Sequence, residues 1–381
     1  MPLHDVGYRP WSGRLRPAGG AAAVIAATGI LLAWKSRWLR RTVLFAWSPA
    51  LVFAISFFAF EQAVEEGRVA RLQIAPPSGG AIDGVGMLGA VLADTLGGGR
   101  HGGPTGSVEE IRRLVWSRLL LAFMRAPQAV LLAVVIGLVA PPLISGDLRA
   151  KAWLVYFTRP LSRSEYILGK AAILGVIVAL VTMVPALVLW IMGVLVSPSV
   201  WVAVTTWDLP LRIILASIVL AVPTVLMALA FSSLTAESRI AAFAWFATWV
   251  ACWITHSALV SADMLAAAGR TEMRSFEPLP DPFADDQVVP TPQDRPPPPR
   301  FERRGDVSQR FRWLTRAAGL DTTIDRWSWL SLYHSLGVLQ AWVFGIERRT
   351  AAIVPPLITL AVVTLLSLAV LYLRVDRPTR A

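Results

Sequence analysis

Long apolar blocks alternate with short polar or basic segments along this chain. A helix needs about 20 apolar residues to cross the core of a bilayer, and six blocks approach or exceed that length. They are residues 42–60, 127–144, 166–196, 211–231, 240–260 and 351–373. The pattern predicts an all-α integral membrane protein with six transmembrane helices.

A shorter apolar block precedes the first predicted span. Residues 20–34 supply only about three-quarters of a membrane-spanning length. Basic residues follow the block at once: Lys35, Arg37, Arg40 and Arg41. The pattern favours a helix lying in the membrane interface, and a short span stays open as an alternative. A signal peptide is disfavoured, because arginines stand where a small-residue cleavage site would be.

The basic residues predict which segments face the cytoplasm, since short cytoplasmic loops are enriched in lysine and arginine. Residues 1–41 and the loop at residues 145–165 are basic, whereas residues 197–208 contain neither lysine nor arginine. The segment 351–381 ends in a basic tail with Arg374, Arg377 and Arg380. We therefore expect both termini in the cytoplasm, with spans one to five within residues 42–260.

Two longer segments are expected on the opposite side of the membrane. Residues 61–125 form an outer loop in which residues 108–123 have the periodicity of an amphipathic helix. Residues 261–350 form a second outer region, whose proline-rich part, residues 278–300, is expected to be extended or disordered. Aromatic residues typical of the membrane interface follow: Trp313, Trp327, Trp329, Tyr333 and Trp342.

The composition agrees with a membrane protein. Of the 381 residues, 55% are hydrophobic and 16% are charged, and the mean hydropathy is +0.57. The net charge of +11 would suit nucleic-acid binding, but the arginines adjoin the apolar blocks and form no separate basic domain. We predict a lipid bilayer and no nucleic acid as partner. The absence of asparagine, with only three lysines, suggests a GC-rich bacterial source and the bacterial inner membrane.

Ionisable residues are nearly absent from the predicted spans. Glu165 and Lys170 mark the cytoplasmic end of the third span, and His256 lies near the outer end of the fifth. Ion-coupled transporters keep ionisable groups deep in the membrane, so this chain has nothing to couple to a gradient. His256 is interpreted as a neutral histidine satisfied by a neighbouring helix, with a functional role as the alternative.

Residues for catalysis, metal binding or cofactor binding are also missing. The single cysteine, Cys252, and the scattered histidines give no metal-ligand spacing. The glycines of residues 84–89 match a dinucleotide fingerprint, but no strand–helix–strand unit surrounds them. After Gly169 and Lys170, Ala171 stands where a phosphate-binding loop needs serine or threonine. We predict no catalytic residue, no cofactor and no ATP hydrolysis on this chain.

The most informative stretch is residues 141–170, PPLISGDLRAKAWLVYFTRPLSRSEYILGK. Leu148, Ala152, Val155 and Tyr156 recur at helical spacing, so one face of a short helix is expected to press into a groove on a soluble partner. Arg149 and Lys151 would then face acidic residues at the rim of the groove.

The second half of this stretch forms a turn and the start of the third span. Pro160 ends the short helix because proline lacks an N–H group, and Arg159 and Arg163 are placed to pair with lipid phosphates or the partner. Gly169 permits close backbone packing where the span begins. A basic cytoplasmic loop without any partner is the simpler alternative, since such loops occur in many membrane proteins.

In its order of features the stretch resembles the permease subunits of type-two ABC exporters. In that family an acidic residue follows the second span, and a short cytoplasmic helix, a proline-centred turn and Gly-Lys come next. The resemblance covers most of the chain and departs from the family at Lys151-Ala152-Trp153, where Gly-Thr-Leu is usual, and in the length of residues 261–350.

The resemblance implies a permease that moves substrate through a dimeric helical bundle driven by separate ABC ATPase subunits. It also implies a second permease copy, identical or related, and leaves open an extracytoplasmic partner at residues 261–350. The residues assigned to ATPase coupling are Asp147, Leu148, Arg149, Lys151, Tyr156, Arg159, Pro160, Arg163, Gly169 and Lys170. A noncatalytic membrane scaffold and, less favoured, a membrane-embedded enzyme are the alternatives.

Overall fold

The computed structural model describes most of the chain, and every regular element in the described ranges is a helix. These ranges are residues 20–67, 107–127, 131–152, 161–275, 327–347 and 349–376, with the single positions Val69, Leu92 and Leu96. The expected all-α architecture is confirmed for this part of the chain. The proline-rich residues 278–300, Trp313, Arg377 and Arg380 lie outside it.

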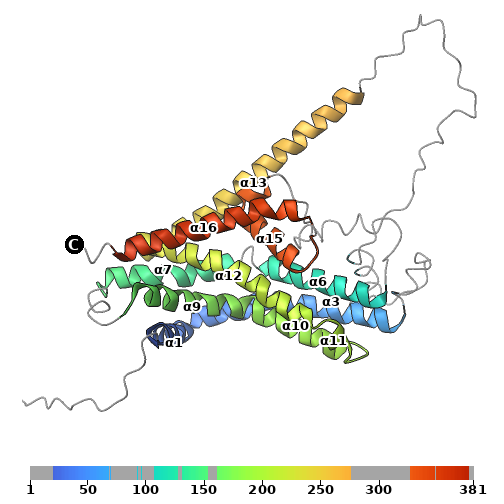
Figure 1. Ribbon diagram of the computed structural model, residues 1–381, viewed down its shortest axis with the longest axis horizontal. Coiled ribbons are helices and arrows are strands. Elements are labelled where there is room, and N and C mark those ends of the chain that lie inside the picture. The colour runs from blue at the N-terminus through green and yellow to red at the C-terminus, as the bar shows by residue number, and fades with distance from the viewer. Residues whose placement is uncertain are drawn as a thin grey trace, which may run out of the picture.

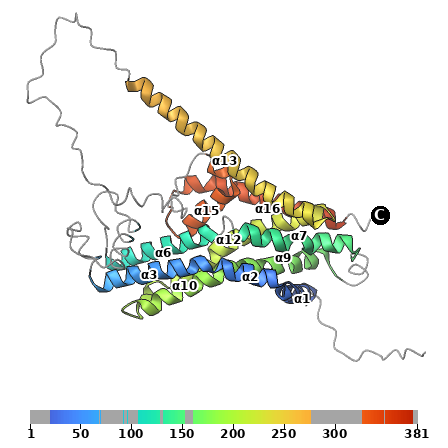
Figure 2. The ribbon, with the colours of Figure 1, turned by 180° about the vertical axis from the view of Figure 1, so that it is seen from behind.

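The helices form an elongated bundle in which the chain passes back and forth along one axis (Figure 1). Figure 2 shows α2 and α3 as one arm that continues from α1 and lies beside α10. The helices are α1 (Gly20–Lys35), α2 (Arg37–Ala46), α3 (Ser48–Glu65), α6 (Val108–Pro127), α7 (Ala133–Arg149), α9 (Arg163–Val181), α10 (Met183–Val196), α11 (Val202–Thr205), α12 (Asp208–Leu234), α13 (Ser238–Ser275), η2 (Ser328–Leu330), α15 (Leu332–Val343) and α16 (Thr350–Asp376).

Five helical stretches in the described part are long and apolar enough to cross a membrane. They are Arg37–Glu65, Arg163–Val196, Asp208–Leu234, Ser238–Asp263 and Thr350–Val375. Each contains one of the predicted spans and extends it at one or both ends. A multi-pass membrane protein is therefore the class of molecule that this bundle defines.

Two boundaries differ from those expected. The second predicted span, residues 127–144, is not described as one helix: α6 is described as far as Pro127, and α7 begins at Ala133 and is 17 residues long. The helix of the fifth predicted span, α13, continues past the expected boundary at residue 261 and projects from the bundle as far as Ser275 (Figure 1). Small apolar residues with high helix propensity, in the segment after Asp263, explain this continuation.

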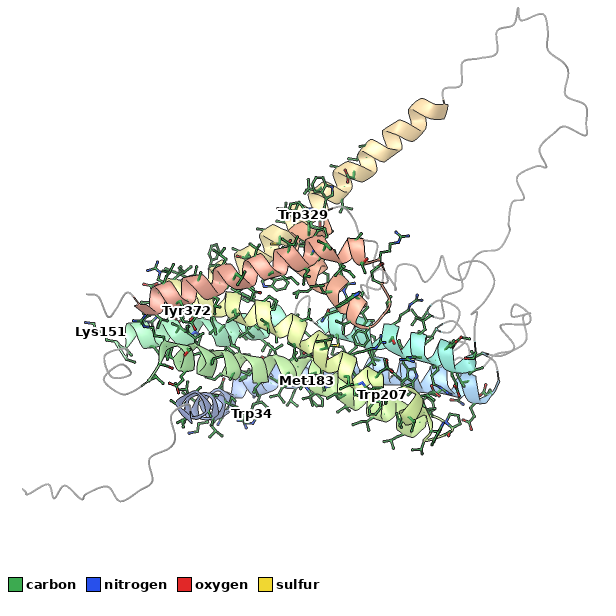
Figure 3. The ribbon with its side chains drawn as sticks, in the orientation of Figure 1. Trp34, Lys151, Met183, Trp207, Trp329 and Tyr372 are labelled. Atoms are coloured by element: carbon green, nitrogen blue, oxygen red, sulfur yellow. The ribbon has the colours of Figure 1, made fainter. Side chains whose placement is uncertain are left out.

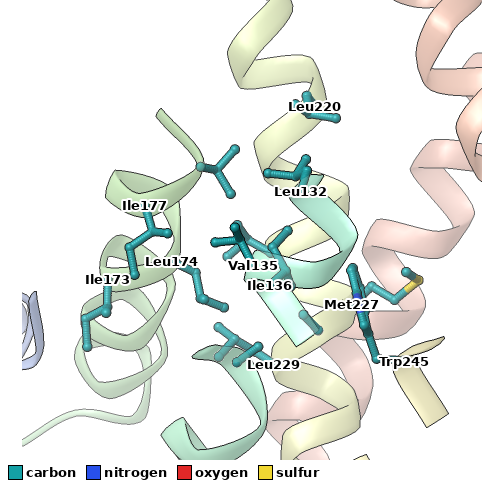
Figure 4. Close-up of a cluster of buried hydrophobic side chains, with 14 of the residues drawn as sticks. Leu132, Val135, Ile136, Ile173, Leu174, Ile177, Leu220, Met227, Leu229 and Trp245 are labelled. Carbon is teal, nitrogen blue, oxygen red and sulfur yellow. The ribbon is translucent and has the colours of Figure 1, made fainter. Parts of the chain in front are cut away.

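One apolar core lies between α7, α9, α12, α13 and α16 (Figure 4). Ile136, Leu174 and Leu229 are fully buried there. Trp245 from α13 is also buried, and its indole N–H donates to the carbonyl of Ala133 at 2.9 Å. Since lipid is as apolar as these side chains, close packing and such hydrogen bonds hold the helices together more than the hydrophobic effect does.

A second core joins α3, α6, α10, the start of α12 and α15. Trp116 of α6 is fully buried and meets Phe57 of α3 edge to face, with ring centroids 5.4 Å apart. The carboxylate of Glu61 accepts from Arg112 and from the Trp116 indole, both at 3.0 Å. The helix expected in an outer loop, α6, is thus an integral part of the bundle.

The neighbouring arginine fastens α6 to a different helix. Arg113 lies 2.6 Å from the carboxylate of Asp208, which also pairs with Arg212 at 2.8 Å within α12. Arg212 in turn donates to the carbonyl of Val343 at the end of α15, at 3.4 Å. Adjacent arginines therefore tie α6 to α3 on one side and to α12 on the other.

The buried pair should contribute strongly to stability. Replacing Arg112 with leucine leaves the Glu61 carboxylate buried without its cation, so Arg112→Leu should lower the free energy of unfolding by about 3–5 kcal/mol. Arg113→Leu removes a half-exposed arginine and should cost no more than about 1 kcal/mol. Unfolding of both variants in mixed detergent micelles measures the difference. Equal losses would contradict the role given to the Glu61–Arg112 pair.

Candidate functional site

The end of α7 meets the beginning of α9 through a partly buried carboxylate. Asp147 accepts a hydrogen bond from the Tyr166 hydroxyl at 2.7 Å and pairs with the Lys170 ammonium at 2.8 Å. Lys170 also donates to the carbonyl of Leu143 at 2.7 Å. The Asp147 and Lys170 side chains are only 18% and 11% exposed. We call Asp147, Tyr166 and Lys170 the Asp147 strut, because it fixes the distance between the two helices.

A serine from α12 holds α7 at its proline pair. Prolines inside a helix remove backbone hydrogen bonds and bend it, so their neighbours need other partners. The Ser232 hydroxyl donates to the carbonyl of Pro141 at 2.6 Å and accepts from the N–H groups of Ile144 and Ser145, each at 3.1 Å. The Ser145 hydroxyl lies 2.9 Å from that of Ser238 on α13. The end of α7 is therefore bonded to α9, α12 and α13.

The start of α9 is fixed by its own cap and by α1. The Ser162 hydroxyl accepts from the N–H of Glu165, whose carboxylate accepts from the Ser162 N–H at 2.9 Å, a reciprocal capping box. Gly169 lies directly against α1: a Cβ atom there would sit 2.8 Å from the Ile25 side chain. The close packing expected at Gly169 is observed, and its partner is α1.

The predicted coupling residues divide into two groups in the structure. Asp147 and Lys170 face each other inside the bundle, and Leu148 packs against the apolar core, so these side chains do not form an outward surface. Arg149, Lys151 and Arg163 are exposed at the same end of the bundle. The last three predicted residues, Tyr156, Arg159 and Pro160, lie outside the described part of the chain.

The expected helical face beginning at Leu148 is interrupted. Leu148 belongs to α7, which ends at Arg149, and Lys151 has a φ of 51° that no α-helix contains. Arg149 donates to the carbonyl of Ala236 in the α12–α13 turn, at 3.3 Å. Figure 3 shows Lys151 at the end of the bundle where Tyr372 and the basic end of α16 also lie.

Sequence reasoning missed several residues of this site. Tyr166, Ser145, Ser232 and Ser238 have polar side chains in apolar surroundings, but nothing in their spacing identifies their partners. Only the cap had a readable signal, since Ser162 followed three residues later by Glu165 is the pattern of a capping box.

A second group of ionisable side chains lies between α6, α13 and α15. His256 of α13 stacks on His334 of α15, with ring centroids 3.7 Å apart. The guanidinium of the buried Arg125 lies 5.2 Å from the Tyr333 ring, next to His334. Burial, then the charges of His256 and Arg125, lower the pKa of His334 from 6.5 to about 4. His256 is thus packed on a neighbouring helix.

The chemistry available to these groups is limited. In the ranges that the structure describes, no three His, Cys, Asp or Glu side chains come together in a way that could hold a metal ion. In the Asp147 strut the carboxylate pairs with the Lys170 ammonium and accepts a hydrogen bond from the Tyr166 phenol. Such an arrangement supports mechanical connection between helices better than proton transfer or nucleophilic attack.

Comparison with known proteins assigns the family. The sequence model of the family described as ABC-2 family transporter protein matches residues 42–377. The chain therefore belongs to the ABC-2 transporter family, and it is a membrane permease of an ABC transporter. No protein with a curated description matches it. Membership agrees with a transport subunit that lacks catalytic activity of its own and works with an ABC ATPase.

The histidine pair predicts a pH dependence of stability. The pKa of His334 is about 4 in the folded protein and near 6.5 when exposed, so the unfolded state binds a proton that the folded state does not. Stability should therefore fall as the pH is lowered from about 6.5 towards 4. Thermal unfolding in detergent across this range measures the effect.

The variant His334→Gln supplies the control, because it keeps a polar side chain but cannot take up the proton. Carboxyl groups elsewhere also titrate in this range, and they are common to both proteins. The acid-induced drop in melting temperature should be a few degrees smaller in His334→Gln. Identical pH profiles would show that His334 does not determine the response.

Proposed function

We propose that this permease crosses the membrane six times, with both termini in the cytoplasm of a bacterial cell. The second crossing would be made by α7, which runs between α9, α12 and α13 in the bundle. Its kink and its short length suit a span that α6 continues on the outer side. The basic ends of α1 and α16, at the Asp147 strut end, support a cytoplasmic position for that end.

The proposed coupling surface is the exposed part of the loop at residues 145–165. The observation that carries it is the bracing of this loop: the Asp147 strut and Ser232 bond its beginning to α9 and α12. A force that a docked partner applies to Arg149, Lys151 or Arg163 would then move several spans together. The predicted role of Asp147 and Lys170 is accordingly transmission of movement, not contact with the partner.

The transport mechanism follows from this arrangement. Two permease copies, or this chain and a related one, would enclose a pathway at their interface. ABC ATPase subunits would dock on the loop from the cytoplasm, and ATP binding and hydrolysis on those subunits would drive alternating access. The permease forms no covalent bond with its substrate and contributes binding surface and movement. Export of a lipid, glycan, drug or peptide is the activity that the family resemblance suggests.

One observation favours an additional outer role. Helix α13 continues past Asp263 to Ser275 and projects from the rest of the bundle (Figure 1). A helix in this position could pass the movement of the spans to an extracytoplasmic partner. The scaffold alternative would use the same extension without any ATPase.

Co-purification in mild detergent tests the proposal. The tagged chain should bring down an ABC ATPase in a fixed ratio, and the complex should hydrolyse ATP. A folded chain that reproducibly lacks an ATPase would favour the scaffold interpretation.

Charge reversal in the loop should abolish ATPase association. The double variant Arg159→Glu with Arg163→Glu changes the expected docking surface and leaves the spans untouched, so membrane insertion should be normal. Arg37→Glu with Arg41→Glu makes the same change of charge on α2 and should retain the ATPase. Quantitative pull-down compares the two variants. Undiminished association of the loop variant would overturn the docking assignment.

Loss of the Asp147 strut should have a different effect. Asp147→Asn keeps a partner for Tyr166 but removes the ion pair with Lys170, so the ATPase should still bind while transport per ATP falls about tenfold. Glu237→Gln, at an exposed carboxylate of the α12–α13 turn, is the matched control. Transport and ATP hydrolysis are measured in proteoliposomes.

A purely structural role for Asp147 gives another result. The variant would then have a lower melting temperature, and its transport per ATP would equal that of the wild type.

A further inference from the structure

The junction of α1 and α2 forms an open groove. Ser36 interrupts the helix with a φ of −67° and a ψ of 119°, and its hydroxyl accepts from the N–H of Leu39 at 3.4 Å to cap α2. The chain therefore turns between the two helices. The groove at this turn has a volume of about 470 Å³ and is lined by Leu31, Trp34, Lys35 and Arg40. We call it the elbow groove.

Helix α1 lies across the end of the bundle. Figure 1 shows it almost end-on, while the long helices run across the picture. Its inner face packs on α9 through Gly29, which contacts Ile173, and through Ile25, which contacts Gly169. The opposite face of α1 is exposed, and Leu31 on it is 66% exposed. A helix in this orientation, at the end of the spans, lies in the plane of a membrane surface.

The charge around the groove has one sign. No aspartate or glutamate occurs between residues 20 and 60, whereas four basic residues lie at the turn and on α2. All four side chains are exposed: Lys35, Arg37, Arg40 and Arg41. Lys35 and Arg40 line the groove, whereas Arg37 and Arg41, one helical turn apart on α2, are not among its lining residues.

We propose that the elbow groove binds one anionic phospholipid of the cytoplasmic leaflet. Lys35 and Arg40 would hold the headgroup phosphate, the Trp34 ring would lie at the level of the glycerol ester groups, and Leu31 would contact an acyl chain. The combination of two cations with two exposed apolar side chains matches an amphipathic ligand better than a free anion. The position of the groove on the cytoplasmic side rests on the proposed orientation of the permease.

A lipid at this place would act on the coupling end of the bundle. Helix α1 contacts Gly169, which precedes Lys170 of the Asp147 strut. A bound lipid would anchor α1 in the membrane surface and so restrain the beginning of α9. The site is thus a device by which anionic lipid stabilises the geometry of the loop.

Native mass spectrometry of the full chain tests the proposal. The detergent-solubilised protein is titrated with phosphatidylglycerol or with phosphatidylcholine, and the fraction carrying one lipid is measured. The wild type should prefer phosphatidylglycerol. Lys35→Gln with Arg40→Gln should weaken phosphatidylglycerol binding roughly thirtyfold, or about fivefold for each basic residue.

The matched variant Arg37→Gln with Arg41→Gln removes the same charge outside the groove and should bind within a few fold of the wild type. Lys35→Arg with Arg40→Lys keeps both charges and should also bind. Melting temperatures establish that all variants are folded. The measurement needs neither an ATPase nor a known orientation, so its failure is distinct from a failure of the proposed function.

Three results would overturn the proposal. Equal weakening in the two charge-removing variants would mean diffuse attraction to the basic surface. Equal binding of phosphatidylcholine and phosphatidylglycerol by the wild type would remove the role of the headgroup charge. Displacement of the lipid by millimolar inorganic phosphate would identify a site for free anions.

Discussion

Carboxylates shielded from solvent, Glu61 fully and Asp147 in part, join the helices at both ends of this bundle, and each is held by one cation and one aromatic donor. Asp147 accepts from Lys170 and Tyr166 at one end, and Glu61 accepts from Arg112 and Trp116 at the other. Away from water, a lone charge between helices would cost several kcal/mol. Each carboxylate therefore requires its partners to stay in place, and the helix positions follow from that requirement.

The two ends of the bundle differ in which helices these bonds connect. At the loop end, the strut, the Ser232 hydrogen bonds and the packing of Gly169 on α1 connect most of the neighbouring helices within a short distance. A force applied there acts on a braced unit. This suits the proposed mechanism, in which an ABC ATPase subunit would release the chemical energy and the loop would pass it to the spans as movement.

The opposite end of the bundle contains ionisable side chains of several kinds, including arginines and histidines. Arg112 and Arg113 connect α6 to two other helices, and His256 stacks on His334 beside α6. Helix α6 thus brings polar groups into contact with α3, α12 and α15. The long α13 projects from the bundle (Figure 1).

The sequence by itself determined the class of protein and most span positions, because hydrophobic runs and basic flanks are local patterns. The assignment of residues 145–170 to ATPase coupling stays a prediction. The sequence did not determine which side chains meet. Asp147 and Lys170 were both assigned to ATPase coupling, but their pairing with each other was not expected, and Glu61 and Arg112 pair across 51 positions. Those contacts depend on which helices become neighbours and how each is rotated, and only the packing of the whole bundle decides that.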